Sequence, residues 1–279
     1  MVSLGLIGHP VRHSLSKIMH EAAFKELDIE GSYRLFDVGP EGIDWFLQTD
    51  GGELDGFNVT IPNKVEVIQH LDVLSRGAEL IGAVNTVKNQ DGCLTGFNTD
   101  GTGFIESLRD VGEDVEGRET LIFGAGGAAR ALAYQILLDG GQVKFCVRRE
   151  DLETALNLSS EIKHQLGNEV RVHVLDEAEG LLNSCEIMVN ATPLGMKPNT
   201  EEAVVDVELI PEDVLVVDIV YNPVETKLIR QARENGLKTV QGVGMLVHQG
   251  AKALEIWLDV DAPIDAMREA VVARLNPKQ

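Results

Sequence analysis

The stretch TLIFGAGGAARALAYQILLDGGQVKFCVRRE, residues Thr120–Glu150, joins two apolar runs through a glycine-rich turn and a helix-length segment. Within it, Gly124, Gly126 and Ala129 fit the pattern G-x-G-x-x-G/A, which here follows a predicted strand and opens a predicted helix. Glycines allow a tight turn and let the backbone approach a pyrophosphate, while the helix N-terminus offers unpaired N–H groups. A tight turn without a ligand is the alternative, but this context favours a dinucleotide-binding turn.

The residues after the second apolar run indicate which dinucleotide is bound. NAD-binding units usually place Asp or Glu at the end of this strand, whereas Arg148 and Arg149 stand here. Two guanidiniums suit the 2′-phosphate of NADP, because they form charge-assisted, bidentate hydrogen bonds with it. We therefore expect NADP. The alternative is that the arginines pair with Glu150, Asp151 or Glu153, which leaves NAD possible.

Strand and helix patterns alternate on both sides of this stretch. Toward the C-terminus, the runs at residues 185–192 and 214–221 are apolar on both faces, as buried parallel strands are. Toward the N-terminus, strands are predicted at residues 4–8, 32–38 and 54–61, and helices at 14–29, 41–49 and 64–72. Either Ser14 or Ser16 is expected to cap the first of these helices. The alternation predicts an α/β fold with mainly parallel sheets.

Two features divide the chain into domains. Residues 83–100 predict a β-hairpin with a turn at Asp91 and Gly92. After Gly103 come an amphipathic helix and a polar linker, residues 113–119. We place the first domain boundary there, between an N-terminal α/β domain and a Rossmann-type domain at residues 104–242.

The composition excludes several classes of function. The formal net charge is −21, from 45 acidic and 24 basic residues, which argues against a nucleic-acid or anionic membrane surface. No apolar run is long enough for a membrane span, and no signal peptide is predicted at the N-terminus. The scattered residues Cys93, Cys146 and Cys185 predict a reducing compartment, and we expect a cytoplasmic protein. No spacing of Cys and His residues indicates a metal site.

Polar side chains gather at predicted strand ends in the N-terminal half, where α/β proteins place their sites. They are Ser14, Ser16, Asn58, Thr60, Lys64, Asn85, Thr86, Asn98, Thr99 and Asp100. Side chains of this kind suit a polyhydroxylated ligand. Each of them could instead cap a local turn.

Lys64, in FNVTIPNK at residues 57–64, is the candidate for acid–base chemistry. Pro62 suits a first helical turn, so Lys64 is predicted near a helix N-terminus, where the helix dipole disfavours its charge. Asp100, from a separate loop, would hold the ammonium group. A Lys–Asp pair can move a proton to and from a substrate hydroxyl during hydride transfer. An exposed lysine at an ordinary helix start is the alternative.

Taken together, these motifs resemble the shikimate/quinate dehydrogenase family along nearly the whole chain. GHPVRHSLSKIMHEAAF resembles the opening substrate-binding motif, and FNVTIPNK resembles the motif with the catalytic lysine. GFNTDGTGF resembles the block with the catalytic aspartate, and GAGGAARA is similar to the cofactor turn. Further blocks of the family are similar to GAVNTV, NATPLGM, DIVYNPVET and GMLVHQGAKALEIW.

The resemblance implies reversible oxidation of shikimate to 3-dehydroshikimate, a step of aromatic amino-acid and chorismate biosynthesis, with NADP. It implies that residues 243–279, with two predicted helices, return to residues 1–103 to complete the substrate domain. Lys64 and Asp100 would be the catalytic pair. Together with this pair, the implied substrate-binding residues are Ser14, Ser16, Asn58, Thr60, Asn85, Tyr221 and Gln249. The implied cofactor-binding residues are Gly124, Ala125, Gly126, Gly127, Ala128, Arg148, Arg149, Thr192, Ile219, Gly242 and Met245.

The chain departs from the family's motifs at three places. Lys17 and Glu21 replace a usual proline and a common asparagine, and Val147-Arg148-Arg149 replaces Asn-Arg-Thr. Because RRED also resembles members that use NAD and accept quinate, a dual shikimate/quinate dehydrogenase using NAD as well is the alternative. A ligand-binding regulator without turnover is the hypothesis from another class. The expected partner is a small-molecule substrate, and we expect a monomer or homodimer.

Overall fold

The structure, a computed structural model, describes residues 1–276 and contains two compact units. Unit 1 consists of Met1–Gly103 with the described residues from Val247 onward, and unit 2 consists of Phe104–Leu246. The expected domain ranges place the second crossing four residues earlier, after residue 242. Gly242 packs in unit 2, since a Cβ there would lie 2.4 Å from the Ile219 carbonyl oxygen. The last three residues of the expected range 243–279 lie outside the described residues.

Unit 2 is built on a six-stranded parallel sheet of order β12-β11-β10-β7-β8-β9. Its strands are β7 (Glu119–Phe123), β8 (Gln142–Val147), β9 (Arg171–Val174), β10 (Ile187–Asn190), β11 (Leu215–Asp218) and β12 (Thr239–Gln241). Four of the six, including β10 and β11, are short apolar runs, as expected of strands covered on both faces. The strand order is that of a Rossmann-type fold. From β7 the sheet extends through β8 to β9 on one side, and through β10 and β11 to β12 on the other.

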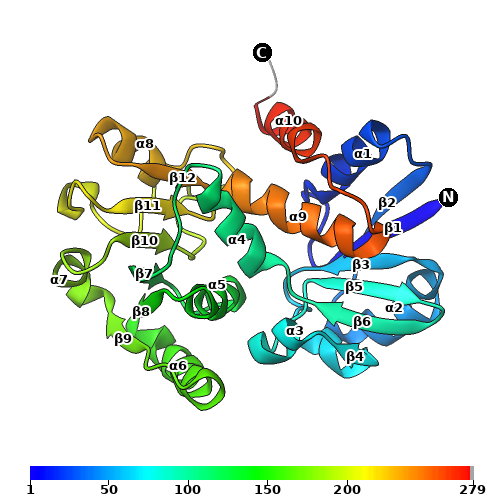
Figure 1. The fold of residues 1–279 in the computed structure, drawn as a ribbon, viewed down its shortest axis with the longest axis horizontal. Coiled ribbons are helices and arrows are strands. Elements are labelled where there is room, and N and C mark those ends of the chain that lie inside the picture. The colour runs from blue at the N-terminus through cyan, green and yellow to red at the C-terminus, as the bar shows by residue number, and fades with distance from the viewer. Residues whose placement is uncertain (277–279) are drawn as a thin grey trace. The chain divides into compact units, whose positions relative to one another are not determined.

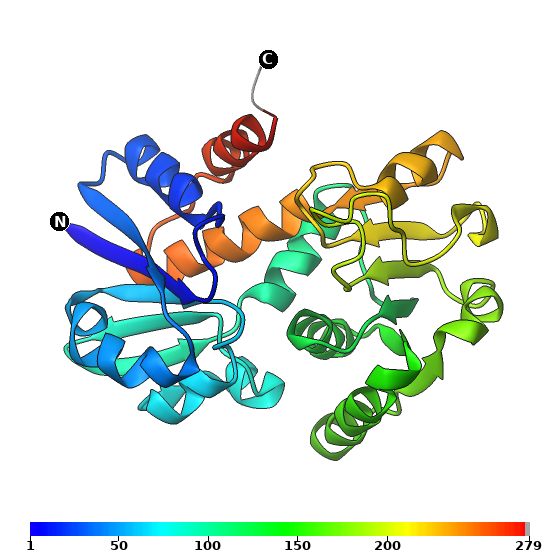
Figure 2. The same ribbon diagram turned by 180° about the vertical axis from the view of Figure 1, so that it is seen from behind.

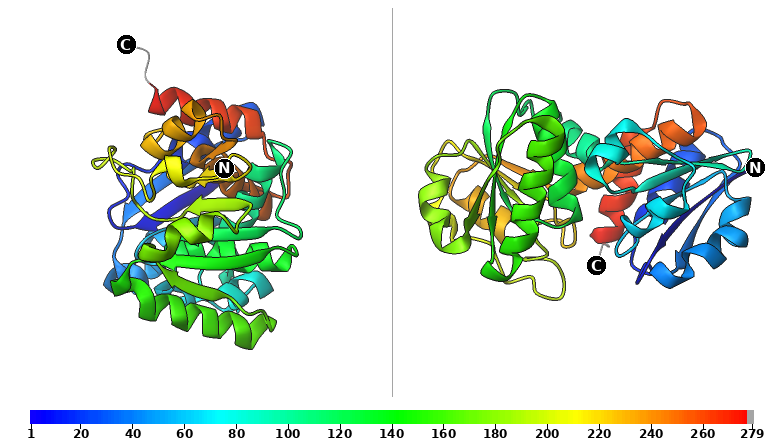
Figure 3. Two further views of the ribbon diagram at one scale, coloured as in Figure 1. Left: turned by 90° about the vertical axis from the view of Figure 1, so that its left-hand side faces the viewer. Right: turned by 90° about the horizontal axis from the view of Figure 1, so that it is seen from below.

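Helices cover both faces of this sheet (Figure 1 and the right-hand view of Figure 3). On one face, α5 packs on β7 and β8, and α6 packs on β8 and β9. On the other face, α7 and α8 bury an apolar cluster that includes Leu121, Phe123 and Val216. The helices of unit 2 are α5 (Gly127–Leu138), α6 (Leu152–Leu166), α7 (Ala178–Leu182) and α8 (Lys227–Glu234), and most of α4 (Asp100–Arg109) also belongs to it.

Unit 1 contains a mixed six-stranded sheet of order β2-β1-β3-β5-β6-β4. Its strands are β1 (Val2–Gly8), β2 (Gly31–Asp37), β3 (Gly56–Val59), β4 (Val73–Leu74), β5 (Thr86–Gln90) and β6 (Cys93–Phe97). β1 pairs in parallel with β2 and β3, whereas β5 and β6 form the predicted antiparallel hairpin. Asp91 and Gly92 both have positive φ, as the two-residue turn between these strands requires.

The helices of unit 1 lie on both faces of its sheet and bring the C-terminal part of the chain to it. They are α1 (Ser16–Glu26), α2 (Ile43–Gln48), α3 (Arg76–Ile81), the residues of α9 (Gly242–Leu258) from Val247 onward, and α10 (Ile264–Leu275). α1 and α10 lie side by side (Figures 1 and 2). The Trp257 indole donates 2.8 Å to the Val87 carbonyl, which fixes α9 on β5. On the opposite face, α2 and α3 bury an apolar cluster around Phe46 and Phe57.

Two local predictions were wrong. Residues 64–72 do not form an α-helix, because only a 3₁₀ helix, Glu66–His70, occurs there. The N-cap of α1 is Leu15, without a side-chain cap bond, although Ser14 Oγ accepts the Ser16 amide at 3.2 Å.

Neither a membrane span nor a metal cluster occurs among residues 1–276. None of the helices in this part of the chain is both long enough and apolar enough to cross a bilayer. Within the same residues, no three Cys, His, Asp or Glu side chains are grouped to hold a metal ion.

Candidate active site

Lys64 extends from a tightly held turn after β3. The Asn63 amide donates to the Thr60 carbonyl at 2.9 Å, and the Lys64 carbonyl accepts from the Val84 amide at 2.8 Å. The side chain of Asn63, to which the sequence assigned no task, is fully buried and donates to the Val38 carbonyl at 2.8 Å. The backbone that carries Lys64 is therefore anchored to two other segments of unit 1.

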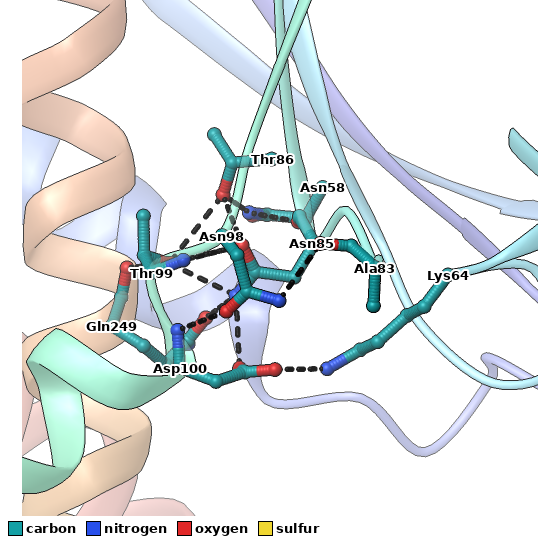
Figure 4. A network of polar contacts seen from close by, with 9 residues as sticks. All are labelled: Asn58, Lys64, Ala83, Asn85, Thr86, Asn98, Thr99, Asp100 and Gln249. Atoms are coloured by element: carbon teal, nitrogen blue, oxygen red, sulfur yellow. Dashed lines mark hydrogen bonds and ion pairs between the residues drawn. The ribbon is translucent and has the colours of Figure 1, made fainter. Parts of the chain in front are cut away.

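The structure brings Lys64 and Asp100 together (Figure 4). Lys64 Nζ lies 2.5 Å from Asp100 Oδ2, and the two side chains are 20% and 8% exposed. Asp100 begins α4, and its amide donates to Asn98 Oδ1 at 3.1 Å. Its second carboxylate oxygen accepts from Asn85 Nδ2 at 2.8 Å. The carboxylate is thus held from both sides and presents the lysine ammonium in one position.

Asn85 is the centre of the hydrogen-bond network around this pair. Its amide nitrogen also donates to Thr99 Oγ1 at 2.9 Å and lies 3.5 Å from Gln249 Oε1. Its amide oxygen accepts the Thr99 amide at 2.8 Å. The Thr99 hydroxyl in turn donates to the Gln249 carbonyl at 2.9 Å, so α9 is tied to the network. Gly103 allows this approach, because a Cβ there would lie 2.6 Å from the Gln249 amide nitrogen.

Asn58 extends the network toward β2. Its amide nitrogen donates to the Asn85 carbonyl and to Thr86 Oγ1, both at 3.1 Å, and its amide oxygen accepts the Tyr33 hydroxyl at 2.7 Å. Both amide hydrogens are therefore used within the protein, and only the oxygen keeps a free acceptor position. Tyr33 is fully buried, and burial raises its pKa, so it acts as a neutral donor.

The remaining predicted substrate-binding residues lie outside this network. Thr60 is half-buried in the turn after β3, and Ser16 is buried in the first turn of α1, next to Ser14. Tyr221 belongs to unit 2 and follows β11, and burial raises the pKa of its hydroxyl. The structure thus brings together Asn58, Lys64, Asn85, Asp100 and Gln249 in one network.

In unit 2 the glycine-rich turn has the geometry that the sequence predicts. Gly124 has a φ of +102°, and a Cβ there would lie 3.1 Å from the Ala191 carbonyl oxygen. α5 begins at Gly127 with Gly126 as its N-cap, and a Cβ at either position would meet no atom within 4 Å. The N-terminus of α5 therefore has open space in front of it, and an anion could approach its N–H groups closely.

Arg148 and Arg149 are exposed and already paired with carboxylates. Arg148 lies 3.0 Å from Glu150 and 2.8 Å from Asp151, which is the pairing considered as the alternative. Arg149 lies 2.5 Å from Asp176, which the sequence did not suggest because Asp176 follows β9. These arginine side chains are 60% and 75% exposed, so a phosphate can reach them.

The other predicted cofactor residues lie in the segments after β10, β11 and β12. Thr192 donates to Asn190 Oδ1 through its hydroxyl, at 2.6 Å, and the Ile219 amide donates to the Asn190 carbonyl at 3.1 Å. Gly242 packs against Ile219, and Met245 is buried in the first turns of α9.

Two further functional candidates in unit 2 were not predicted from the sequence. Asn190 and Asp218 are the last residues of β10 and β11, and both are buried. The signal that could have found them is a polar residue that ends an apolar strand, because ligands bind at the carboxyl ends of parallel strands.

The parallel sheet order of unit 2 and its glycine-rich turn define a Rossmann-type α/β protein. The chain belongs to the shikimate dehydrogenase family. The family profile described as "Shikimate dehydrogenase substrate binding domain" matches residues 6–87, and "Shikimate 5'-dehydrogenase C-terminal domain" matches residues 242–272.

Individual relatives agree with this assignment over nearly the full length. The chain is 45% identical to shikimate dehydrogenase (NADP(+)) of Methanopyrus kandleri, over 98% of this chain and 96% of that protein. A crystal structure of a shikimate dehydrogenase in complex with NADP+ superposes with a TM-score of 0.93 at 40% identity, covering 99% and 96% of the two chains. Shikimate 5-dehydrogenase from Listeria monocytogenes, in complex with shikimate and NAD, gives 0.90 at 38% identity, covering 96% of each chain.

Proposed function

We propose that the protein is an NADP-dependent shikimate dehydrogenase that reversibly reduces 3-dehydroshikimate to shikimate. The observation that carries this proposal is the partly buried Lys64–Asp100 pair, with Nζ and Oδ2 2.5 Å apart in a polar network. Full-length relatives that carry the name shikimate dehydrogenase (NADP(+)) support the choice of substrate and cofactor. Initial rates with shikimate and NADP test it.

The acid–base step falls to Lys64. When bound, the nicotinamide supplies the hydride for reduction and accepts it for oxidation. In the direction of reduction, the Lys64 ammonium gives a proton to the carbonyl oxygen of the substrate as the hydride reaches its carbon. In the direction of oxidation, neutral Lys64 takes the hydroxyl proton. Asp100 holds the amine in place, because its other oxygen is fixed by Asn85.

The polar side chains of the site suit a substrate with a carboxylate and several hydroxyl groups. The free acceptor position on Asn58 Oδ1 suits one substrate hydroxyl. The residues proposed to hold the substrate with the catalytic pair are Ser14, Ser16, Asn58, Thr60, Asn85, Tyr221 and Gln249. Asn85 has a second proposed role, because it already donates to Asp100 and thereby positions the pair.

The turn at Gly124–Ala128 fits a dinucleotide diphosphate, since Gly126 and Gly127 leave the N-terminus of α5 open. We propose that the N–H groups of Gly124, Ala125, Gly126, Gly127 and Ala128 hold the diphosphate. Arg148 and Arg149 would exchange their carboxylate partners for the 2′-phosphate. Thr192, Ile219, Gly242 and Met245 would contact the rest of the cofactor.

A dual shikimate/quinate dehydrogenase that also uses NAD is the second candidate. The carboxylates beside Arg148 favour it, and the Listeria monocytogenes relative was solved with NAD. Initial rates with shikimate or quinate and NADP or NAD decide between the two. We expect the highest kcat/KM with shikimate and NADP. Comparable kcat/KM with quinate and NAD would replace the narrower assignment.

A ligand-binding regulator of the same fold makes a different prediction, since it would bind both ligands without turnover. The formed Lys64–Asp100 pair supports the enzyme instead. Shikimate-dependent formation of NADPH is the measurement, and binding of both ligands without it would favour the regulator.

We further propose that the enzyme works in the cytoplasm as a monomer or homodimer. The cysteines Cys93, Cys146 and Cys185 are free thiols, as is usual in a reducing compartment. Light scattering in solution measures the oligomeric state.

A further inference from the structure

Asp218, the last residue of β11, is a fully buried carboxylate that the proposed chemistry does not use. Its Oδ1 accepts from Asn190 Nδ2 and from the Val220 amide, both at 3.0 Å, and its Oδ2 accepts the Thr226 hydroxyl at 2.6 Å. All of these donors are neutral. A buried carboxylate is usually paired with a cation, so Asp218 is an unusual group to find at a strand end.

Burial without a cation makes the charged form of this group costly. It raises the pKa of Asp218 to about 6, although three hydrogen bonds oppose the shift. An apolar or amide side chain would avoid this cost. Buried groups with shifted pKa values cluster at functional sites, so the segments that Asp218 holds in place are candidates for ligand binding.

Asp218 connects the two loops that follow β10 and β11. Through Asn190 it reaches the first loop, because Asn190 Oδ1 accepts from the Thr192 amide at 3.1 Å and from its hydroxyl at 2.6 Å. Through the Val220 amide it holds the second loop, in which Val220 lies between Ile219 and Tyr221. Two residues predicted to contact the cofactor, Thr192 and Ile219, are therefore linked to this carboxylate through Asn190.

These loops belong to the second half of the Rossmann sheet. Such a sheet has two mononucleotide-binding halves, and a dinucleotide lies across the carboxyl ends of their strands. The glycine-rich turn after β7 and the arginines after β8 occupy the half that would take the diphosphate and the 2′-phosphate. The loops after β10 and β11 are therefore left for the nicotinamide half.

We propose that Asp218 is a positioning residue that holds the loops after β10 and β11 in the arrangement that binds the nicotinamide half of the cofactor. This inference rests on the proposed function for the identity of the cofactor. It assigns to Asp218 no contact with the reacting atoms, and its effect is on cofactor affinity.

The test compares NADP with 2′,5′-ADP, which has the adenosine and the 2′-phosphate but no nicotinamide. In Asp218→Ala, loss of buried hydrogen bonds to a carboxylate should raise the Kd for NADP roughly tenfold. The Kd for 2′,5′-ADP should stay within about twofold. Asp218→Asn should recover most of the NADP affinity, because its amide oxygen can still accept from Asn190 and Val220. If Asp218→Ala does not fold, Asn190→Ala is the test variant, because it removes the link between Asp218 and Thr192 and should likewise weaken binding of NADP but not of 2′,5′-ADP.

Leu182→Ala is the matched control for lost stability. Leu182 is fully buried in the apolar cluster of unit 2 and contributes no hydrogen bond to the loops. This variant should unfold at a lower temperature and bind both ligands normally. An equal loss of affinity for NADP and 2′,5′-ADP in the Asp218 variants would mean a general structural role and would overturn the proposal. Unchanged NADP affinity in Asp218→Ala would overturn it as well.

Binding and activity measurements on the protein without substitutions distinguish failure of this proposal from failure of the proposed function. If it binds NADP but does not oxidise shikimate, the proposed function fails, while the Asp218 comparison can still be made by titration calorimetry. If it binds neither NADP nor 2′,5′-ADP, both proposals are wrong.

Discussion

The two units build their candidate sites in opposite ways. In unit 1, the Lys64 and Asp100 side chains are 20% and 8% exposed, and neutral side chains such as Asn85 hold the carboxylate by directed hydrogen bonds. In unit 2, the Arg148 and Arg149 side chains are 60% and 75% exposed, and their partners are surface carboxylates. One site is formed by the interior of its unit, and the other by its surface.

The difference follows from what each group has to do. A proton donor must be fixed to within a fraction of an ångström, and a buried network supplies that precision because the low dielectric strengthens each hydrogen bond. Exposed ion pairs contribute only about 0–1 kcal/mol, so a phosphate can replace their carboxylates at little cost. In the proposed function, acid–base geometry is built into unit 1, whereas cofactor choice in unit 2 depends on side chains whose ion pairs are easily exchanged.

Replacing Lys64 should have the largest effect on activity. We expect Lys64→Ala to lower kcat roughly 100-fold or more, the usual contribution of a positioned acid–base group. Steady-state kinetics with shikimate and NADP measure it. Lys17→Ala is the control, because Lys17 is an exposed lysine on α1 that only pairs with Glu21. A near-normal kcat in Lys64→Ala would remove Lys64 from the chemistry.

Acid should lower the free energy of unfolding of unit 1, because a histidine is buried in its interior. His20 is fully buried, stacks on Tyr33, and has no hydrogen-bond partner on either ring nitrogen among the described residues. Burial lowers its pKa from 6.5 to about 3. The stability it contributes is therefore complete above pH 6.5 and is lost as the pH falls toward 3. Between pH 7 and 4.5 we expect the free energy of unfolding to fall by about 3 kcal/mol because of this group.

His20→Phe tests this, since it keeps a ring between Tyr33 and Trp257 but cannot titrate. Urea unfolding at both pH values gives the free energies. The difference between the two pH values should shrink in the variant, whatever its absolute stability. An identical pH dependence in both proteins would show that His20 does not carry the effect.

Loosening the network around the pair should have a smaller effect. Asn85→Ala removes the donor to Asp100 Oδ1 and the acceptor of the Thr99 amide, so we expect kcat to fall roughly tenfold. Asn89→Ala is the matched control, because Asn89 is on β5 and donates only to backbone carbonyls away from the site. If both variants lost the same activity, the network would have no special role in placing Asp100.

Removing an exposed arginine should have the smallest effect. In Arg148→Ala we expect the KM for NADP to rise only several-fold, because solvent screens the bond to the 2′-phosphate. The KM for NAD should not change. Arg171→Ala, an exposed arginine on β9, is the control. Equal changes with both cofactors would mean that Arg148 does not select NADP.

Much of the fold could be predicted from local patterns. The hairpin at Asp91 and Gly92, the parallel strands of unit 2 and the turn at Gly124 each depend on residues adjacent in the chain. The prediction of an α-helix at residues 64–72 was wrong. The Ile68 amide donates to the Val65 carbonyl, and the Lys64 carbonyl accepts from the Val84 amide, a non-local contact that periodicity does not report. The pairing of Arg148 with its neighbours was foreseen as an alternative, but the pairing of Arg149 with Asp176 requires the position of β9.

The sequence by itself determined the α/β class, the glycine turn and the candidate residues, because backbone conformation and apolar periodicity are short-range properties. Only the tertiary structure decided which candidates meet. Lys64 and Asp100 are 36 residues apart in the chain, and Asn85 and Gln249 are 164 apart. The burial of Asp218 among neutral donors likewise depends on the tertiary structure. Such contacts depend on how the sheet and its helices pack, which is a property of the whole chain.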